Sequence, residues 1–233
     1  MTFDRRQMFL AVGVFVATSM LAGGTRQTST SGPPRKFAPP APVLQAAAPP
    51  VPPKLAAAPI IRSVVPVKLL AAAKSALDRQ DRSILRDRTA VVDFAAPSSE
   101  PRLHLVDLQS GKERSLLVTH GSGSDPDHSG WTRRFSNDEG SNASSEGAFA
   151  TLNYYFGKHG RSQRLAGLDA SNSNALSRAI VIHGAWYAEP NVVDATGKLG
   201  RSQGCFAVGE TLIDQLFDHL GSNRLIYAAK LTA

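Results

Sequence analysis

Residues 201–205 read RSQGC, and this segment contains Cys205, the only cysteine of the 233-residue chain. It lies downstream of the apolar run IVIH, residues 180–183, which predicts a buried strand ending at His183. A cysteine attacks as its thiolate, and a neighbouring histidine supplies the thiolate by accepting the thiol proton and holding the ion pair. We therefore expect Cys205 to be a nucleophile and His183 its base. An inert buried cysteine and a core histidine are the alternative interpretation.

The first residues predict an exported protein. Residues 4–10 read DRRQMFL and precede an apolar run that ends at Ala22, which is typical of a secretory signal. We expect residues 1–24 to be an export signal; Arg5 and Arg6 resemble a twin-arginine signal, although the general secretory route fits equally. The apolar run is shorter than the roughly 20 residues of a membrane span, so no span is expected after cleavage. The predicted location is the periplasm or cell wall.

Residues 25–66 predict a linker. Eleven of the fifteen prolines lie between Pro33 and Pro66, mixed with alanine. Such a composition does not bury a core, and it favours either extended polyproline structure or disorder. We expect a disordered tail between the signal and the folded domain.

Charge divides near residue 89. Residues 1–89 carry 13 Lys and Arg against 4 Asp and Glu, whereas residues 90–233 carry 13 against 15. The net charge of +7 therefore belongs to the N-terminal part. Nucleic-acid binding needs basic residues clustered on the folded surface, so we expect no nucleic-acid partner.

Export limits what the cysteine can do. One cysteine cannot form an internal disulfide, so Cys205 is an inert buried residue, a link to another chain or a reactive thiol. The composition alone leaves all three open.

Periodicity predicts a mainly β domain at residues 90–233, preceded by a short helix at residues 67–89. Short alternating runs predict strands, and Ser110 with Gly111 predicts a hairpin turn. Residues 121–147 are rich in Gly, Ser, Asp and Asn and predict a long loop.

A late helix is predicted at residues 209–221, GETLIDQLFDHLG, where five apolar residues share one helical face before Gly221. It follows Cys205 in the chain. Many short strands with one late helix favour a β-rich sandwich.

Three segments resemble the murein L,D-transpeptidase catalytic domain of the YkuD-like superfamily. They are YFGKHGRSQRLAGLD at 155–169, RAIVIHGAWY at 178–187 and GRSQGC at 200–205. The superfamily signature is a histidine followed by a small residue, and a serine or threonine two residues before a Gly-Cys pair. The matching residues are His183, Gly184, Ser202, Gly204 and Cys205. The better-known branch has a second histidine where this chain has Gln203.

The resemblance implies a β-sandwich with the cysteine at the mouth of a groove. It also implies acyl transfer on peptidoglycan stem peptides: Cys205 attacks the carbonyl of the diamino acid at position three, expels D-alanine and forms a thioester. An amine of another stem then gives a 3-3 cross-link, and water gives L,D-carboxypeptidase activity. A domain that only binds peptidoglycan is the non-enzymatic alternative.

Other positions complete the predicted site. Gly204 is expected to allow a sharp turn that exposes the sulfur and aims backbone N–H groups at a developing oxyanion. Gly184, Ser202 and Gln203 are expected to belong to the same oxyanion and loop region. The residues expected to line the substrate groove are Arg201, Arg178, Tyr155, His159, Arg164, Gly147 and Trp186.

We expect neither a metal nor another cofactor. The remaining histidines, His104, His120, His128 and His219, lack the spacing of metal ligands. Peptidoglycan stem peptides are the expected partner, and the chain is expected to be a monomer.

Overall fold

The computed structural model describes residues 65–231. The predicted export signal and nearly all of the predicted linker lie outside this range. No helix within residues 65–231 is both long enough and apolar enough to cross a bilayer.

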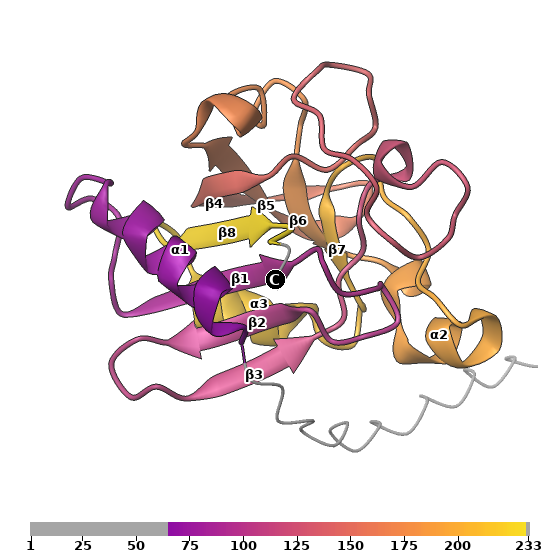
Figure 1. The fold of residues 1–233 in the computed structure, drawn as a ribbon, viewed down its shortest axis with the longest axis horizontal. Coiled ribbons are helices and arrows are strands. Elements are labelled where there is room, and N and C mark those ends of the chain that lie inside the picture. The colour runs from indigo at the N-terminus through magenta and orange to yellow at the C-terminus, as the bar shows by residue number, and fades with distance from the viewer. Residues whose placement is uncertain (1–64, 232–233) are drawn as a thin grey trace, which may run out of the picture. The chain divides into compact units, whose positions relative to one another are not determined.

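Eight strands form one sheet in the order β3-β2-β1-β8-β4-β5-β6-β7 (Figure 1). The strands are β1 Arg88–Asp93, β2 Leu103–Asp107, β3 Glu113–Leu116, β4 Gly147–Gly157, β5 Gly160–Gly167, β6 Val181–Gly184, β7 Phe206–Val208 and β8 Leu225–Ala229. The helices are α1 Val67–Asp78, α2 Pro190–Thr196 and α3 Ile213–Leu220, with short 3-10 turns η1 Ser122–Ser124, η2 Ala170–Asn172 and η3 Trp186–Ala188. Neighbouring strands are antiparallel except β1 with β8 and β6 with β7.

The sheet curls around a single main core. The ring of Phe206 on β7 lies 5.4 Å from that of Phe149 on β4 and 6.4 Å from that of Phe94, which follows β1. The backbone N–H of Thr119, after β3, donates to the carbonyl of Ala207 on β7 at 3.0 Å. The two ends of the sheet therefore approach each other, and the predicted β-rich sandwich is confirmed as one curled sheet.

Helix α3 closes this core. Its apolar face buries Leu216, Phe217 and Leu220 among side chains from the strands, which confirms the predicted late helix. The predicted hairpin is also present, because β2 and β3 pair in antiparallel register and Gly111 in the turn has a φ of +71°.

Helix α1 lies across the opposite face of the sheet from α3 (Figure 1). Leu69 and Ala73 pack against Val91 of β1 and Ala229 of β8. The predicted helix at 67–89 is therefore shorter than expected, and it belongs to the folded domain rather than leading into it.

The side chain of Arg86 supports the chain at the end of α1. Its guanidinium donates to the carbonyl of Leu77 in the last turn at 3.0 Å and to that of Gln80, just past the helix, at 3.0 Å. The chain turns back there and enters β1 at Arg88, two residues before the predicted domain boundary at 90.

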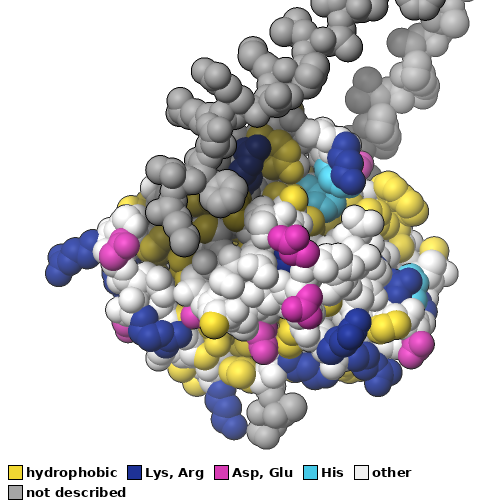
Figure 2. All heavy atoms as spheres, turned by 90° about the horizontal axis from the view of Figure 1, so that it is seen from above, with side chains coloured by type: hydrophobic (Ala, Val, Ile, Leu, Met, Phe, Trp, Pro, Cys, Tyr) yellow, Lys and Arg dark blue, Asp and Glu magenta, His cyan; other side chains and the backbone are white. Residues whose placement is uncertain are grey.

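The surface charge of the folded part is mixed. On the face shown in Figure 2, Lys and Arg side chains are interspersed with Asp and Glu side chains. This agrees with the near balance of charges in residues 90–233.

We expect Leu69→Ala to lower the free energy of unfolding by about 2 to 4 kcal/mol, because truncating a buried leucine leaves a cavity. Leu69 is 1% exposed, whereas Val67 in the same turn is 80% exposed. The matched variant Val67→Ala should change it by less than about 0.5 kcal/mol. Urea unfolding followed by circular dichroism measures both. Equal effects would contradict the place of α1 in the folded domain.

Candidate active site

The parallel pairing of β6 and β7 brings the predicted nucleophile and base together. Ile182 pairs with Phe206, and His183 pairs with Ala207. Cys205 directly precedes β7, and alternate residues of a strand share a face, so Cys205 and His183 are diagonal neighbours on the face opposite the main core. Both side chains line one cavity of about 490 Å³.

The tautomer of His183 is set by its neighbour. The ring Nδ1 lies 2.9 Å from the carbonyl oxygen of Gly184, which can only accept, so Nδ1 carries the proton and Nε2 is the basic nitrogen. Burial lowers the pKa of His183, although the bond to Gly184 opposes this. At neutral pH the ring is therefore neutral and able to accept a proton.

The thiol of Cys205 is protonated at rest. Burial raises its pKa, while an N–H of Val181 and the positive charges of Lys158 and Arg178 oppose the rise. The sulfur lies 3.6 Å from the carbonyl oxygen of Ala179 and donates to it. The resting pair is thus neutral, and the preformed ion pair expected from the sequence is not what this structure describes.

Ala179 holds a backbone conformation that favours glycine. Its φ is +53°, in the left-handed region where a side chain costs about 1 kcal/mol or more. This conformation aims the Ala179 carbonyl at the thiol of Cys205. Strained residues of this kind gather at functional sites.

The RSQGC turn is closed by Ser202. Its hydroxyl donates to the carbonyl of Cys205 at 2.7 Å and accepts from the N–H of Gly204 at 3.1 Å. The N–H of Gly204 therefore already donates to the Ser202 hydroxyl, so it is not free to donate to an oxyanion as the sequence predicted. Gly204 instead makes the turn possible, with a φ of +107°.

Arg178 holds the loop rather than standing free for substrate. One of its terminal nitrogens donates to the Ser136 carbonyl and the Ser145 hydroxyl, and the other donates to the Ser141 hydroxyl and the Ala143 carbonyl. All four lie in the long loop predicted at 121–147, which the structure confirms. The cation still lines the cavity beside Cys205.

A buried cluster supports the same loop from behind. The ring of His120 lies between a guanidinium nitrogen of Arg102 at 2.8 Å and a carboxylate oxygen of Asp125 at 3.1 Å. Since Arg102 can only donate, Nδ1 of His120 accepts and Nε2 donates to Asp125. The carbonyl of His120 accepts the N–H of Ser202 at 3.0 Å, so the cluster positions the turn that carries Cys205.

The cavity includes some of the predicted groove residues. Tyr155, His159, Arg201 and Gln203 line it. Arg201 is partly occupied, because it donates to the carbonyls of Asp125 and Pro126.

Three predicted groove residues lie outside the cavity. Arg164 stacks on the ring of Tyr155 at 4.2 Å and so supports the cavity wall from behind. Gly147 begins β4, where a Cβ atom would lie 2.6 Å from a carboxylate oxygen of Asp169, so its role is structural. Trp186 is 69% exposed and contacts the edge of Tyr187.

Sequence reasoning missed Tyr187, Lys158 and Ala179, which all line the cavity. Tyr187 and Ala179 belong to the segment RAIVIHGAWY, and Lys158 belongs to YFGKHG. The family resemblance therefore covered both segments but did not predict that these three residues line the site. Burial, with a smaller contribution from Cys205, raises the pKa of Tyr187 to about 12, so the phenol stays protonated.

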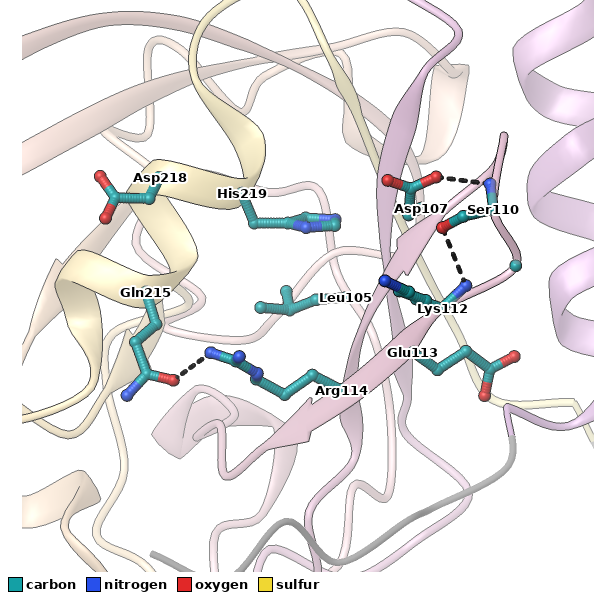
Figure 3. Close-up of a pocket in the computed structure, with 10 residues that line it drawn as sticks. Leu105, Asp107, Ser110, Lys112, Glu113, Arg114, Gln215, Asp218 and His219 are labelled. Carbon is teal, nitrogen blue, oxygen red and sulfur yellow. Dashed lines mark hydrogen bonds between the residues drawn. The ribbon is translucent and has the colours of Figure 1, made fainter. Parts of the chain in front are cut away.

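A second cavity of about 850 Å³ lies between the β2–β3 hairpin and α3 (Figure 3). Arg114 donates to Gln215 across it at 2.6 Å, and Lys112, Asp107 and Asp218 also line it. Its histidine, His219, donates through Nε2 to the carbonyl of Thr89 at 3.1 Å. The lining of this cavity contains no cysteine, so it has no thiol to pair with this imidazole.

No group of three or more His, Cys, Asp or Glu side chains within residues 65–231 is arranged to hold a metal ion.

Cys205 directly before β7 and His183 within the neighbouring parallel strand β6 thus line one cavity of a curled, β-rich domain. Residues 62–229 match the family described as L,D-transpeptidase catalytic domain. The chain therefore belongs to the L,D-transpeptidase catalytic domain family, as the resemblance predicted. At the level of the family, this is a domain of peptidoglycan-modifying enzymes.

Similarity to solved structures is low. An L,D-transpeptidase from Mycobacterium tuberculosis H37Rv has 12% identity and a TM-score of 0.40, over 62% of this chain and 58% of that chain. One from Xylanimonas cellulosilytica DSM 15894 has 16% identity and a TM-score of 0.36, over 67% and 68%. This chain thus spans less than two thirds of the M. tuberculosis enzyme. No curated protein matches the sequence.

We expect Gly204→Ala to lower the free energy of unfolding by about 2 to 4 kcal/mol, because strain and overpacking add. A Cβ atom at Gly204 would lie 2.7 Å from the Ala143 carbonyl oxygen and 2.8 Å from Ile180. Gly111 has a φ of +71° but nothing within 4 Å, so Gly111→Ala should cost only about 1 kcal/mol. Chemical denaturation measures the free energy of unfolding of both variants. Similar losses in the two would contradict the close approach of Ala143 and Ile180 to Gly204.

Stability should fall as the pH drops from about 6.5 to 4. Burial, with the Arg102 charge second, lowers the pKa of His120 from 6.5 to about 4. In this pH range His120 binds a proton in the unfolded chain but stays neutral in the folded chain. This difference lowers the free energy of unfolding by about 3 kcal/mol. Urea unfolding at pH 7, 5.5 and 4 measures the loss, and His120→Gln should flatten it. The same slope in that variant would assign the effect to another group.

Proposed function

We propose that this chain is a peptidoglycan L,D-transpeptidase in which Cys205 is the nucleophile and His183 the general base. The observation that carries the proposal is their position in one cavity, with Nε2 of His183 left basic by the bond from Nδ1 to Gly184. The substrate is the stem peptide of peptidoglycan, and the enzyme acts outside the cytoplasmic membrane, where this polymer lies.

In the first step the sulfur of Cys205 attacks the carbonyl carbon of the diamino acid at stem position three. His183 takes the thiol proton as the carbon–sulfur bond forms. The amide bond to D-alanine then breaks, and His183 gives the proton to the leaving amine. The products are a thioester on Cys205 and free D-alanine. Because the resting pair is neutral, proton transfer accompanies the attack rather than preceding it.

The thioester has two possible acceptors. The side-chain amine of a second stem forms a 3-3 cross-link, and water gives a tripeptide stem. In either case neutral His183 takes a proton from the acceptor and returns it to the sulfur. Gln203 is exposed at the cavity and has no basic nitrogen, so His183 handles these protons without a second base at that position.

The charge of the cavity fits an anionic peptide. Its lining includes Lys158, Arg178 and Arg201 but no aspartate or glutamate. None of the three cations is in a salt bridge within residues 65–231. A stem peptide carries free carboxylates, and a positive cavity in a slightly acidic domain attracts them. Lys158 and Arg178 also favour the thiolate that forms during attack.

Release of D-alanine from tetrapeptide stems tests the proposal. Cys205→Ala should abolish it, because no other thiol exists in the chain. His183→Gln should lower it by about 100-fold or more, the usual effect of losing a general base. The control His219→Gln, in the second cavity, should leave it unchanged. Unchanged release by Cys205→Ala would sink the proposal.

Mass spectrometry of the products separates the alternatives. Dimers joined through two diamino acids indicate transpeptidation, and free tripeptide stems indicate the carboxypeptidase. A chain that binds peptidoglycan but releases no D-alanine, and whose Cys205 resists acylation by a carbapenem, would instead be a binding module.

A further inference from the structure

A second imidazole covers the ring of His183. The ring centroids of His159 and His183 are 4.1 Å apart, and the two planes differ by 20°, so the rings are stacked. His159 lies in the turn between β4 and β5, where Gly160 reverses the hairpin with a φ of +70°. A bulge in β4 between Thr151 and Tyr154 adds local twist to this hairpin.

The stack and one hydrogen bond together hold the base. The bond from Nδ1 to Gly184 fixes one edge of the His183 ring, and His159 covers one of its faces. A ring held on an edge and a face has little freedom to tilt away from Cys205. Aromatic stacking of this kind adds about 0.5 to 1.5 kcal/mol in protein cores.

The two rings cannot both carry a proton at working pH. At an effective dielectric constant of about 20, two charges about 4 Å apart disfavour double protonation by roughly three orders of magnitude. His183 is 2% exposed whereas His159 is exposed. Charging the buried ring costs more desolvation energy, so the first proton binds to His159. The pair therefore titrates as a unit.

The surroundings of the pair oppose its protonation. The other titratable and charged groups that face it across the cavity are Tyr155, Lys158, Arg178, Tyr187, Arg201 and Cys205. Burial, and then the positive charge of Lys158, lower the pKa of His159. No carboxylate lines the cavity to favour an imidazolium.

We propose that His159 is a positioning residue of this active site: its neutral ring holds His183 ready to take the proton of Cys205, and its protonation blocks that transfer. The inference rests on the proposed function, because it takes His183 as the base. When His159 is charged, His183 cannot become an imidazolium beside it. The fall of the reaction rate at low pH, the acid limb of its pH profile, thus reports the first protonation of the pair.

The test measures the rate at which a carbapenem acylates Cys205 in the full-length chain, by intact-protein mass, between pH 5 and 9. His159→Ala removes both the ring and the charge, and should slow acylation at pH 8 by about fivefold to tenfold. His159→Phe restores a ring without a titrating group, and should recover most of that loss. It should also move the acid limb to lower pH, because only buried His183 then titrates. His128→Gln, outside the cavity, should change neither quantity.

Nuclear magnetic resonance of the histidine rings gives a readout that needs no activity. The titration of His183 itself should move to higher pH in His159→Phe, because the repelling proton on His159 is gone. A wild-type rate profile and an unchanged His183 titration in both variants would overturn the inference while leaving the proposed function intact. If wild-type Cys205 is neither acylated nor able to release D-alanine, the proposed function fails, and the His183 titration still decides whether the rings are coupled.

Discussion

The active site depends on the parallel pairing of β6 with β7. This register sets Cys205 beside the strand that contains His183, and it places both side chains on the face away from the main core. Strand β7 has only three residues, so its position comes from its neighbours: β6 on one side, the N–H of Thr119 on the other, and the aromatic contacts of Phe206 beneath. The chemistry therefore rests on the packing of a core that lies on the opposite face.

Two arginines support the long loop beside this pair: buried Arg102 reaches it through His120, and partly buried Arg178 binds it directly. Arg102 binds His120 and backbone carbonyls, and Arg178 binds carbonyls and serine hydroxyls of the loop. Burying a charge is costly unless hydrogen bonds satisfy it, and these acceptors satisfy both guanidinium groups without a direct carboxylate contact. As a result Arg178 fixes the loop and leaves a net positive charge near Cys205. One residue thus links the order of the loop to the electrostatics of the Cys205 thiol.

Desolvation gives the site its resting state. It raises the pKa of the Cys205 thiol and lowers the pKa of His183, so both groups are neutral before substrate arrives. In the proposed mechanism charge then develops only during attack, in a cavity whose cations oppose the imidazolium and favour the thiolate. The ring of His159 fits this arrangement, because a neutral aromatic surface tolerates an imidazolium beside it whereas a second positive charge does not.

The sequence by itself determined the family, the β-rich fold and the late helix, because the family motif lies in short segments and the periodicity of apolar residues indicates the elements. It also singled out Cys205 and His183, which the structure places in one cavity and whose chemical roles stay a prediction. It did not show that α1 packs against the sheet, or that Gly147 and Trp186 lie outside the cavity, since such contacts depend on partners distant in the chain. Only the tertiary structure decided that Arg178 holds a loop and that His159 stacks on His183. The physical reason is that stacking, desolvation and hydrogen-bond partners arise between segments whose distance in space no local pattern records.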